Sequence, residues 1–313
     1  MNGFVSTAQL TNQKVAFREL KLSEYRQLLK CFLGDEIDPI SIFNNTDQIF
    51  KNVTNLTLNE IKKLSFVDYF LLLFYIRQVS VGGNIQLLVF DNEQKQVKID
   101  LNIQHLINEV SFIITNNILD TETIDNYKLQ FRIPSLHELI YAQKETEQFV
   151  YTFFLKSLNT LNFNLNLEEF SYQEREEIFK NLPVKITTTL IKKAQQFIKK
   201  LNNTNLLSKI NNNKFTNTLP FLPNLEILGF ITKLVYNASL ENIYDYIFAL
   251  AKIANLSSNF LDSCSPGEFY LFTKKLELLN AQQTQSSSQS NEASNSIKDE
   301  LPPIVSEANF GLE

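Results

Sequence analysis

The stretch "SFVDYFLLLFYIRQVSVGG", residues 65–83, is the most apolar in the chain, and it could cross a membrane or line a core. Its uninterrupted apolar run extends only from Tyr69 to Ile76, whereas a helix that spans a bilayer needs about 20 apolar residues. Asp68 precedes the run and Arg77 follows it, and each charge complements the helix dipole at its end. The stretch therefore predicts a helix that is apolar on nearly every face and is buried by other elements.

Residues on both sides of this helix predict a compact α+β unit over residues 1–103. A short strand is expected at 14–20, where polarity alternates. After the glycine pair, two strand-like runs flank the polar turn "DNEQ", as in a β-hairpin near 85–101. We expect the strand to join this hairpin in one small sheet. Three helices that begin at capping residues or at a proline are expected at 23–33, 38–53 and 57–64.

The region 104–280 is predicted to be mostly helical. Segment 127–134 looks extended, but apolar residues recur at helical spacing through most of the rest. Ser135 with Glu138, and Ser171 with Glu174, have the spacing of capping boxes. Helices are expected at 135–158, 171–182, 184–201, 222–236, 239–256 and 265–279.

The last part of the chain, residues 281–313, predicts a disordered tail. The segment "QQTQSSSQSNEASNSIKDE" has too few apolar residues to offset the entropy of ordering. The end regains apolar side chains, which either form a partner-docking peptide on a flexible tether or belong to an inert tail. These side chains are Leu301, Ile304, Val305 and Phe310. The expected fold class is thus mostly α, with a small α+β N-terminal unit (a short strand plus a β-hairpin) and a disordered C-terminal tail.

Composition limits the classes of partner and the compartment. The formal net charge is -5, so no general attraction to nucleic acid or anionic lipid is expected. The two cysteines, Cys31 and Cys264, are far apart in sequence, and the N-terminus lacks the pattern of a secretion signal. These features favour a reduced, cytosolic protein with no membrane-spanning segment.

No catalytic, cofactor-binding or metal-binding residue is predicted. The two histidines, His105 and His137, have no metal-ligand spacing to cysteines or carboxylates, and we interpret them as structural. An acidic group around residues 168–177 could supply paired carboxylates for acid–base chemistry, but its position at a helix start favours a solvated face. The basic run that contains Lys192, Lys193, Lys199 and Lys200 is also interpreted as a solvated face.

Two segments carry a family likeness. The sequence "FRELKLSEYRQLLKCFLGDEID" (17–38), followed by "LSFVDYFLLLFYIRQVSVGG" (64–83), resembles the baseplate hub assembly proteins of T-even-type phages. An extended segment, a helix that ends at glycine, the central helix and a Ser-x-Gly turn occur in the family order. The likeness is expected to cover about residues 10–200. Because the matching residues are of a core-forming type, they indicate a fold more directly than a role.

The resemblance implies a non-enzymatic protein of phage tail morphogenesis. It would be a baseplate hub component or a hub assembly factor, and its partners would be other hub or tail proteins. It would act in the host cytoplasm during assembly or in the tail baseplate of the virion. Two alternatives stay open at this point: a tail-tip enzyme such as a peptidoglycan hydrolase, and an acidic adaptor protein unrelated to the baseplate.

Overall fold

The fold is mainly helical, and its N-terminal part surrounds the apolar stretch quoted above. The computed structural model describes residues 6–33, 38–90, 96–116, 121–142, 147–160, 163–202, 232–233, 235–236 and 238–287. The first elements are β1 (Ser6–Gln9), β2 (Lys14–Phe17), α1 (Leu22–Lys30), α2 (Pro39–Val53), α3 (Leu58–Lys63) and α4 (Phe66–Ser80).

Helix α4 confirms the prediction of a buried central helix. Tyr69, Leu73 and Ile76 are each no more than 1% exposed, and buried side chains occupy every face of the helix. Ser65 caps its start by accepting a hydrogen bond from the Asp68 amide. Apolar side chains on all faces need neighbours on all sides, so the other elements assemble around α4. Within the described residues, no helix is long and apolar enough to cross a membrane.

The N-terminal strands form a pair of their own, so the expected pairing of strand 14–20 with the later hairpin is wrong. β2 pairs antiparallel with β1, and Ser6 lies opposite Phe17. The hairpin is a separate two-stranded sheet. β1 is close to β2 in sequence, so this pairing closes a much shorter loop than pairing with strands beyond α4. The hairpin and the next helix are β3 (Asn84–Phe90), β4 (Gln96–Asn102) and α5 (Ile103–Asn116).

A four-stranded antiparallel sheet follows α5, in a region that the sequence predicted to be mostly helical. The expected helix 135–158 is divided into a short α-helix, a 3-10 helix and a strand. The run "QFVYTFF" is rich in aromatic and β-branched residues, which favour helices only weakly. The strand that follows this run, Leu155–Asn159, forms backbone hydrogen bonds with the strand Tyr127–Phe131. The elements are β5 (Glu122–Ile124), β6 (Tyr127–Phe131), α6 (Leu136–Ala142), η1 (Glu147–Phe154), β7 (Leu155–Asn159), β8 (Asn164–Asn166) and η2 (Leu167–Glu169).

The remaining described elements are helices. Four lie near predicted positions: α7 (Tyr172–Lys180), α8 (Val184–Asn202), α10 (Leu240–Ile253) and α12 (Pro266–Ser287). The short helix α11 (Ser258–Ser263) was not predicted. Helix α12 continues through residues 281–287, which were expected to be disordered. Extending a formed helix needs no new nucleus, so the polar residues after Asn280 continue it at low cost. Most of the expected helix 222–236, residues 288–313 and the predicted docking residues Leu301, Ile304, Val305 and Phe310 lie outside the described residues.

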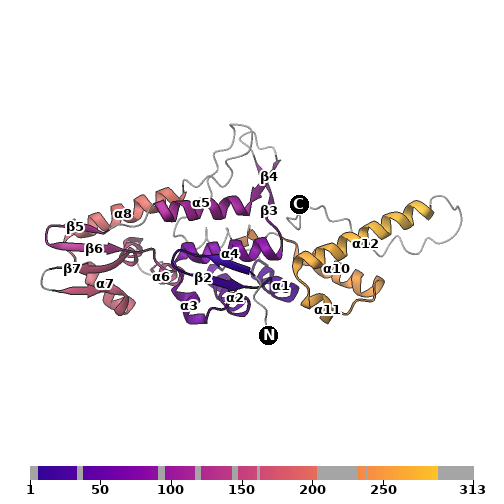
Figure 1. The fold of residues 1–313 in the computed structure, drawn as a ribbon, viewed down its shortest axis with the longest axis horizontal. Coiled ribbons are helices and arrows are strands. Elements are labelled where there is room, and N and C mark those ends of the chain that lie inside the picture. The colour runs from indigo at the N-terminus through magenta and orange to yellow at the C-terminus, as the bar shows by residue number, and fades with distance from the viewer. Residues whose placement is uncertain are drawn as a thin grey trace.

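The molecule is elongated, with three parts along its longest axis (Figure 1). The sheet β5–β8 with α7 lies at one end, the helices around α4 lie in the middle, and α10–α12 lie at the other end. Helices α8 and α5 run along the upper side of the first two parts, and the hairpin β3–β4 projects from the middle.

Candidate functional site

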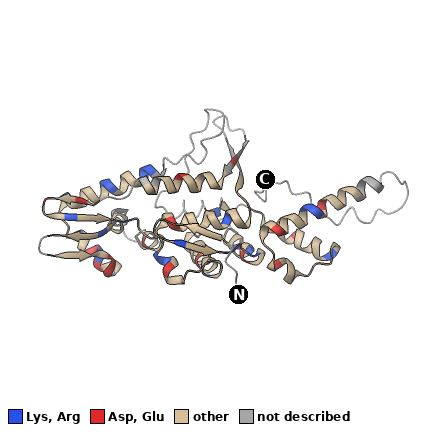
Figure 2. Cartoon of the chain, viewed as in Figure 1, with Lys and Arg blue, Asp and Glu red and all other residues tan. Residues whose placement is uncertain are grey.

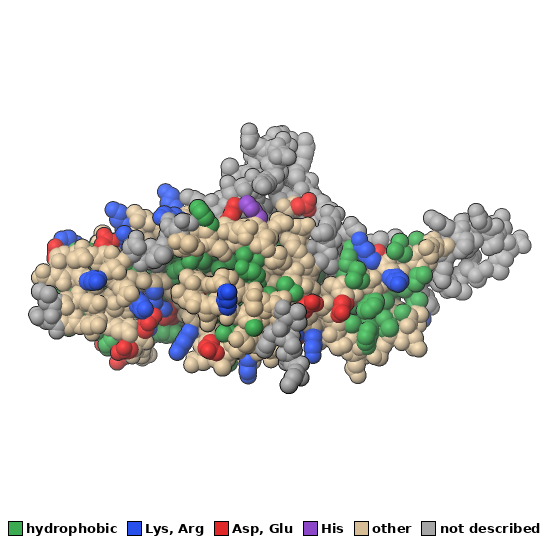
Figure 3. Space-filling model, viewed as in Figure 1, with side chains coloured by type: hydrophobic (Ala, Val, Ile, Leu, Met, Phe, Trp, Pro, Cys, Tyr) green, Lys and Arg blue, Asp and Glu red, His purple; other side chains and the backbone are tan. Residues whose placement is uncertain are grey.

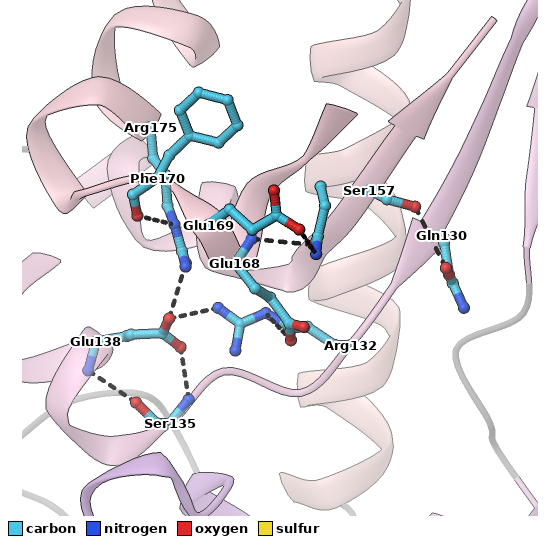
Figure 4. Close-up of polar contacts among 10 residues, drawn as sticks. Gln130, Arg132, Ser135, Glu138, Ser157, Glu168, Glu169, Phe170 and Arg175 are labelled. Carbon is cyan, nitrogen blue, oxygen red and sulfur yellow. Dashed lines mark hydrogen bonds and ion pairs between the residues drawn. The ribbon is translucent and has the colours of Figure 1, made fainter. Parts of the chain in front are cut away.

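A buried ion cluster connects the sheet to α6 and α7 (Figure 4). The Glu138 carboxylate is 7% exposed and accepts a hydrogen bond from Arg175 Nη1 at 2.8 Å and another from Arg132 Nη2. Its other oxygen accepts from the Ser135 amide at 2.8 Å, which completes the capping box predicted from the sequence. The Arg175 guanidinium also lies over the Phe153 ring, 5.6 Å from its centroid. The carboxylate is thus held by contacts within the fold.

A second polar cluster joins α2, α4 and α6. His137 Nε2 lies 2.8 Å from Asp47 Oδ2, and the Tyr69 hydroxyl donates to Asp47 Oδ1 at 2.9 Å. Asp47 is 1% exposed. Burial, together with the Asp47 charge, raises the pKa of Tyr69 well above its usual value. The interpretation of His137 as a structural residue fits this geometry, but the sequence reasoning missed Asp47. The sequence did contain an indication that Asp47 is buried, because Asp47 lies four residues after Phe43 and three before Phe50 and so shares the apolar side of α2.

The other histidine lies on the surface of α5. His105 Nε2 is 2.8 Å from Glu109 Oε1, one turn along the same helix. This position fits the interpretation of His105 as a structural residue.

We expect the two histidines to differ in their effect on stability. Replacing His137 by alanine should cost about 1–3 kcal/mol, because the buried Asp47 carboxylate loses a partner. Replacing the exposed His105 should change the free energy of unfolding by no more than about 0.5 kcal/mol. Urea denaturation measures both values. Equal costs at the two positions would contradict the contact between His137 and the buried Asp47 carboxylate.

Buried Arg77 holds the chain where three segments meet. Its side chain donates to the carbonyls of Val235 and Gly82 at 2.7 Å and of Asn84 at 3.4 Å. Burial lowers the pKa of this guanidinium, and the neighbouring Tyr25 offsets part of the effect. Gly82 has φ 120°, a conformation that suits glycine, and makes the predicted turn from α4 into the hairpin.

The tyrosines around Arg77 predict loss of stability in alkali. Burial raises the pKa of Tyr25 to about 12, and it also raises the pKa of Tyr236. A raised pKa means that the stabilisation is complete below the unfolded value of about 10 and is lost as pH rises toward 12. Ionisation of Tyr25 alone should lower the free energy of unfolding by about 2–3 kcal/mol between pH 10 and pH 12. Circular dichroism melts between these pH values measure the loss.

The control for this prediction is Tyr25→Phe, which cannot ionise and should reduce the dependence of stability on pH. An equal loss of stability between these pH values in wild type and in Tyr25→Phe would contradict the prediction.

The cysteine thiols and the capping carboxylate of the acidic group have shifted pKa values. Burial raises the pKa of both thiols, of Cys31 and of Cys264, which is opposite to what a thiolate nucleophile needs. Glu174 caps α7 through Ser171, and its pKa is lowered by these hydrogen bonds. Within the residues that the structure covers, no group of three or more His, Cys, Asp or Glu side chains could hold a metal.

The predicted charged faces lie where helices meet solvent. Lysine positions lie along α8, and acidic positions gather on α7 (Figure 2). Lys193 pairs with Glu122 at 3.0 Å, and Lys180 pairs with Glu176 at 2.6 Å. Ion pairs of this kind between partly exposed side chains are typical of helix faces in contact with solvent.

A groove of about 490 Å³ lies between α7 and the sheet. Its lining is mainly apolar, with two carboxylates and one amide. The lining residues are Tyr127, Leu158, Phe163, Phe170, Glu174, Glu177, Ile178, Asn181, Leu182 and Pro183. Glu174 is already engaged in the cap of α7, and most of the groove's lining is an apolar contact surface.

The outer surface of α10–α12 carries large apolar side chains that face solvent. Phe248, Leu271 and Leu278 are 67%, 65% and 64% exposed. Figure 3 shows hydrophobic side chains gathered over this end of the molecule. We call this surface the C-terminal face and define it by Tyr244, Phe248, Ile253, Leu271, Leu278 and Leu279. An apolar surface of this kind is typical of a site that contacts another protein.

The three helices beneath this face are fixed to α1. Arg26 forms an ion pair with Asp262 and lies over the Tyr244 ring, 5.1 Å from its centroid. The backbone amide of Leu22 donates to the carbonyl of Cys264 at 2.7 Å. The C-terminal helices are therefore docked on the N-terminal part.

A known protein family, described as T4 bacteriophage base plate protein, matches residues 1–219. The chain belongs to this base plate family. No curated protein and no solved structure matches the chain. Membership confirms the likeness of segments 17–38 and 64–83 to T4-type base plate proteins, without specifying a role in hub assembly, and it excludes an adaptor unrelated to the base plate. The match to the base plate family covers the ion cluster and both histidines, and it ends before α10–α12.

Proposed function

We propose that the chain is a hub component or a hub assembly factor of a contractile phage tail, and that it acts through protein–protein contacts without catalysis. The observation that carries the proposal is the base plate family match over residues 1–219. This range includes both segments that resemble hub assembly proteins.

The buried polar chemistry supports a structural role. Glu138 lies between two guanidiniums and Asp47 lies between an imidazole and a phenol, so each carboxylate is bonded to groups from other elements. An acid or base in catalysis must instead reach a substrate. Contacts of this kind fix helices and strands relative to one another, and a rigid fold of this kind suits a protein that acts by binding other proteins during assembly.

The surface supports protein partners. The C-terminal face is apolar, and the formal net charge of -5 opposes binding to nucleic acid. We propose other hub or tail proteins as partners. The site of action would be the host cytoplasm during assembly and, for a permanent subunit, the baseplate of the virion.

Mass spectrometry of purified virions, combined with pull-downs from infected cells, tests the proposal. A permanent hub subunit should be present in virions in fixed proportion to other baseplate proteins. An assembly factor should be absent from virions but present on tail intermediates. Absence from both, or hydrolysis of peptidoglycan by the purified chain, would contradict the proposal.

The tail allows a separate test of partner binding. Deleting residues 288–313 should change the free energy of unfolding by less than about 1 kcal/mol, because few apolar side chains are removed. A docking peptide predicts weaker capture of partners by the shortened chain, and also by Phe310→Ala, since buried aromatic residues dominate small interfaces. An inert tail predicts unchanged capture. A markedly lower melting temperature of the shortened chain would refute both predictions. Pull-downs and thermal melts give the two readouts.

A further inference from the structure

The groove between α7 and the sheet β5–β8 lies at one end of the molecule (Figure 1). Glu174, Glu177 and Ile178 of α7 line it, together with Asn181, which follows the helix. Their spacing of three and four residues places them on one face. On the side of the sheet, Leu158 of β7 contributes to the lining and is 3% exposed. One helix face and one strand therefore form the groove.

Phe163 adds an exposed aromatic ring to the lining. Its amide donates to the Thr160 hydroxyl at 3.1 Å, and its carbonyl accepts from the Thr160 amide at 2.8 Å. These bonds fix the chain at the turn between β7 and β8. The Phe163 residue is 47% exposed, so water covers much of an apolar ring beside an apolar groove. Contact with another apolar surface would remove this area from water.

The charges in the groove are of one sign, because both charged residues of its lining are glutamates. Glu174 accepts hydrogen bonds from the amide and the hydroxyl of Ser171. Glu177 is exposed, and its carboxylate has no hydrogen-bond or ion-pair partner among the described residues. A cation of a partner can therefore pair with Glu177 without displacing a contact of the fold.

The basic residues of α7 do not neutralise this face. Arg175 donates to the buried Glu138 carboxylate, and Lys180 pairs with Glu176 at 2.6 Å. Neither Arg175 nor Lys180 lines the groove. The groove thus favours an apolar occupant that carries a positive charge, and it repels an acidic one.

We propose that the groove binds a segment of another tail protein in which aliphatic side chains lie next to a lysine or an arginine. The aliphatic side chains pack against Leu158, Phe163 and Ile178, and the basic group pairs with Glu177. The volume of about 490 Å³ is within the range of about 300–1,000 Å³ that is usual for binding clefts. The inference rests on the proposed function, because it takes the occupant from among the tail proteins.

Photo-crosslinking at position 163 identifies the occupant. The full chain, with the photoreactive analogue p-benzoylphenylalanine in place of Phe163, is supplied in infected cells and irradiated. Mass spectrometry then gives the sequence of the crosslinked peptide. We expect a peptide of another tail protein with a lysine or arginine beside aliphatic residues. The control is the same analogue in place of Phe112 on α5, which is 67% exposed and should not crosslink this peptide.

Charge exchange tests the role of Glu177. A labelled synthetic copy of the crosslinked peptide is titrated with the purified full chain, and fluorescence anisotropy gives the dissociation constant. Glu177→Lys should raise this constant at least about tenfold, since like charges then face each other. A peptide with its basic residue changed to glutamate should restore binding to this variant to within about threefold. The matched control is Glu176→Lys, which makes the same charge change off the groove and should leave the constant unchanged.

Several outcomes would overturn the proposal. They are the absence of any crosslink from position 163, a crosslinked peptide that is acidic or comes from a second copy of this chain, and unchanged binding by Glu177→Lys. The analogue in place of Phe248, on the C-terminal face, separates this failure from failure of the proposed function. Crosslinks to tail proteins from position 248 but none from position 163 would leave the proposed function standing and refute the groove as a binding site.

Discussion

Replacement of Glu138 by glutamine should destabilise the protein by about 3–5 kcal/mol. The change removes the negative charge that lies between Arg132 and Arg175, and it leaves two cationic side chains close together in a largely buried site. Breaking a buried pair costs more than the pair contributes, because the remaining charge has lost both water and its partner. The free energy of unfolding from urea denaturation measures the effect.

The matched control for Glu138 is Glu168→Gln. Glu168 lies 3.7 Å from Arg132, but its side chain is 43% exposed. Its replacement should cost no more than about 1 kcal/mol, because water screens an exposed pair. A second test is the pair of changes Glu138→Leu and Arg175→Met, which removes two charges together and should cost less than Glu138→Leu alone. Equal effects of the changes at Glu138 and Glu168 would show that the cluster is not buried in solution.

Replacement of Leu73 by alanine should cost about 2–5 kcal/mol, because it leaves a cavity in the centre of the core. Leu73 is 0% exposed, and α4 has packed neighbours on every side, so the surroundings have little room to collapse. The matched control is Leu33→Ala, where the side chain is 65% exposed and the change should cost about 0.5 kcal/mol or less. Urea curves of wild type and Leu73→Ala that overlay would show that the core lies elsewhere.

The sequence predicted the central helix well because one physical property decides it. Residues 66–80 carry apolar side chains on every face of the helix. Such a helix is stable only when other elements of the fold bury it. The sheet was harder to predict. The apolar, aromatic run of η1 and the start of β7 suits either a buried helix or a strand. The pairing of β7 with β6 makes it a strand from Leu155 onward, and this pairing cannot be read from local spacing.

The ion cluster shows a similar limit. The capping box of Ser135 and Glu138 was visible because its residues are three positions apart. Arg175 reaches the same carboxylate from a different helix, and nothing in its local sequence indicates this contact. The exposed side of α12 was hidden for another reason. Apolar side chains occupy both its buried and its exposed sides, so its sequence does not reveal which of them face water.

The docking of the C-terminal helices on α1 also bears on how the protein can be divided. The family match stops at residue 219, yet Tyr236 is 1% exposed and packs its ring against Tyr25 of α1 at a centroid distance of 5.9 Å. Arg77 in the central helix likewise donates to the carbonyl of Val235. The limit of the family match is therefore not a physical boundary of the folded molecule. A fragment cut at residue 219 would expose Tyr25 and other buried side chains of α1 to water, so we expect it to be less soluble than a chain that retains α10–α12.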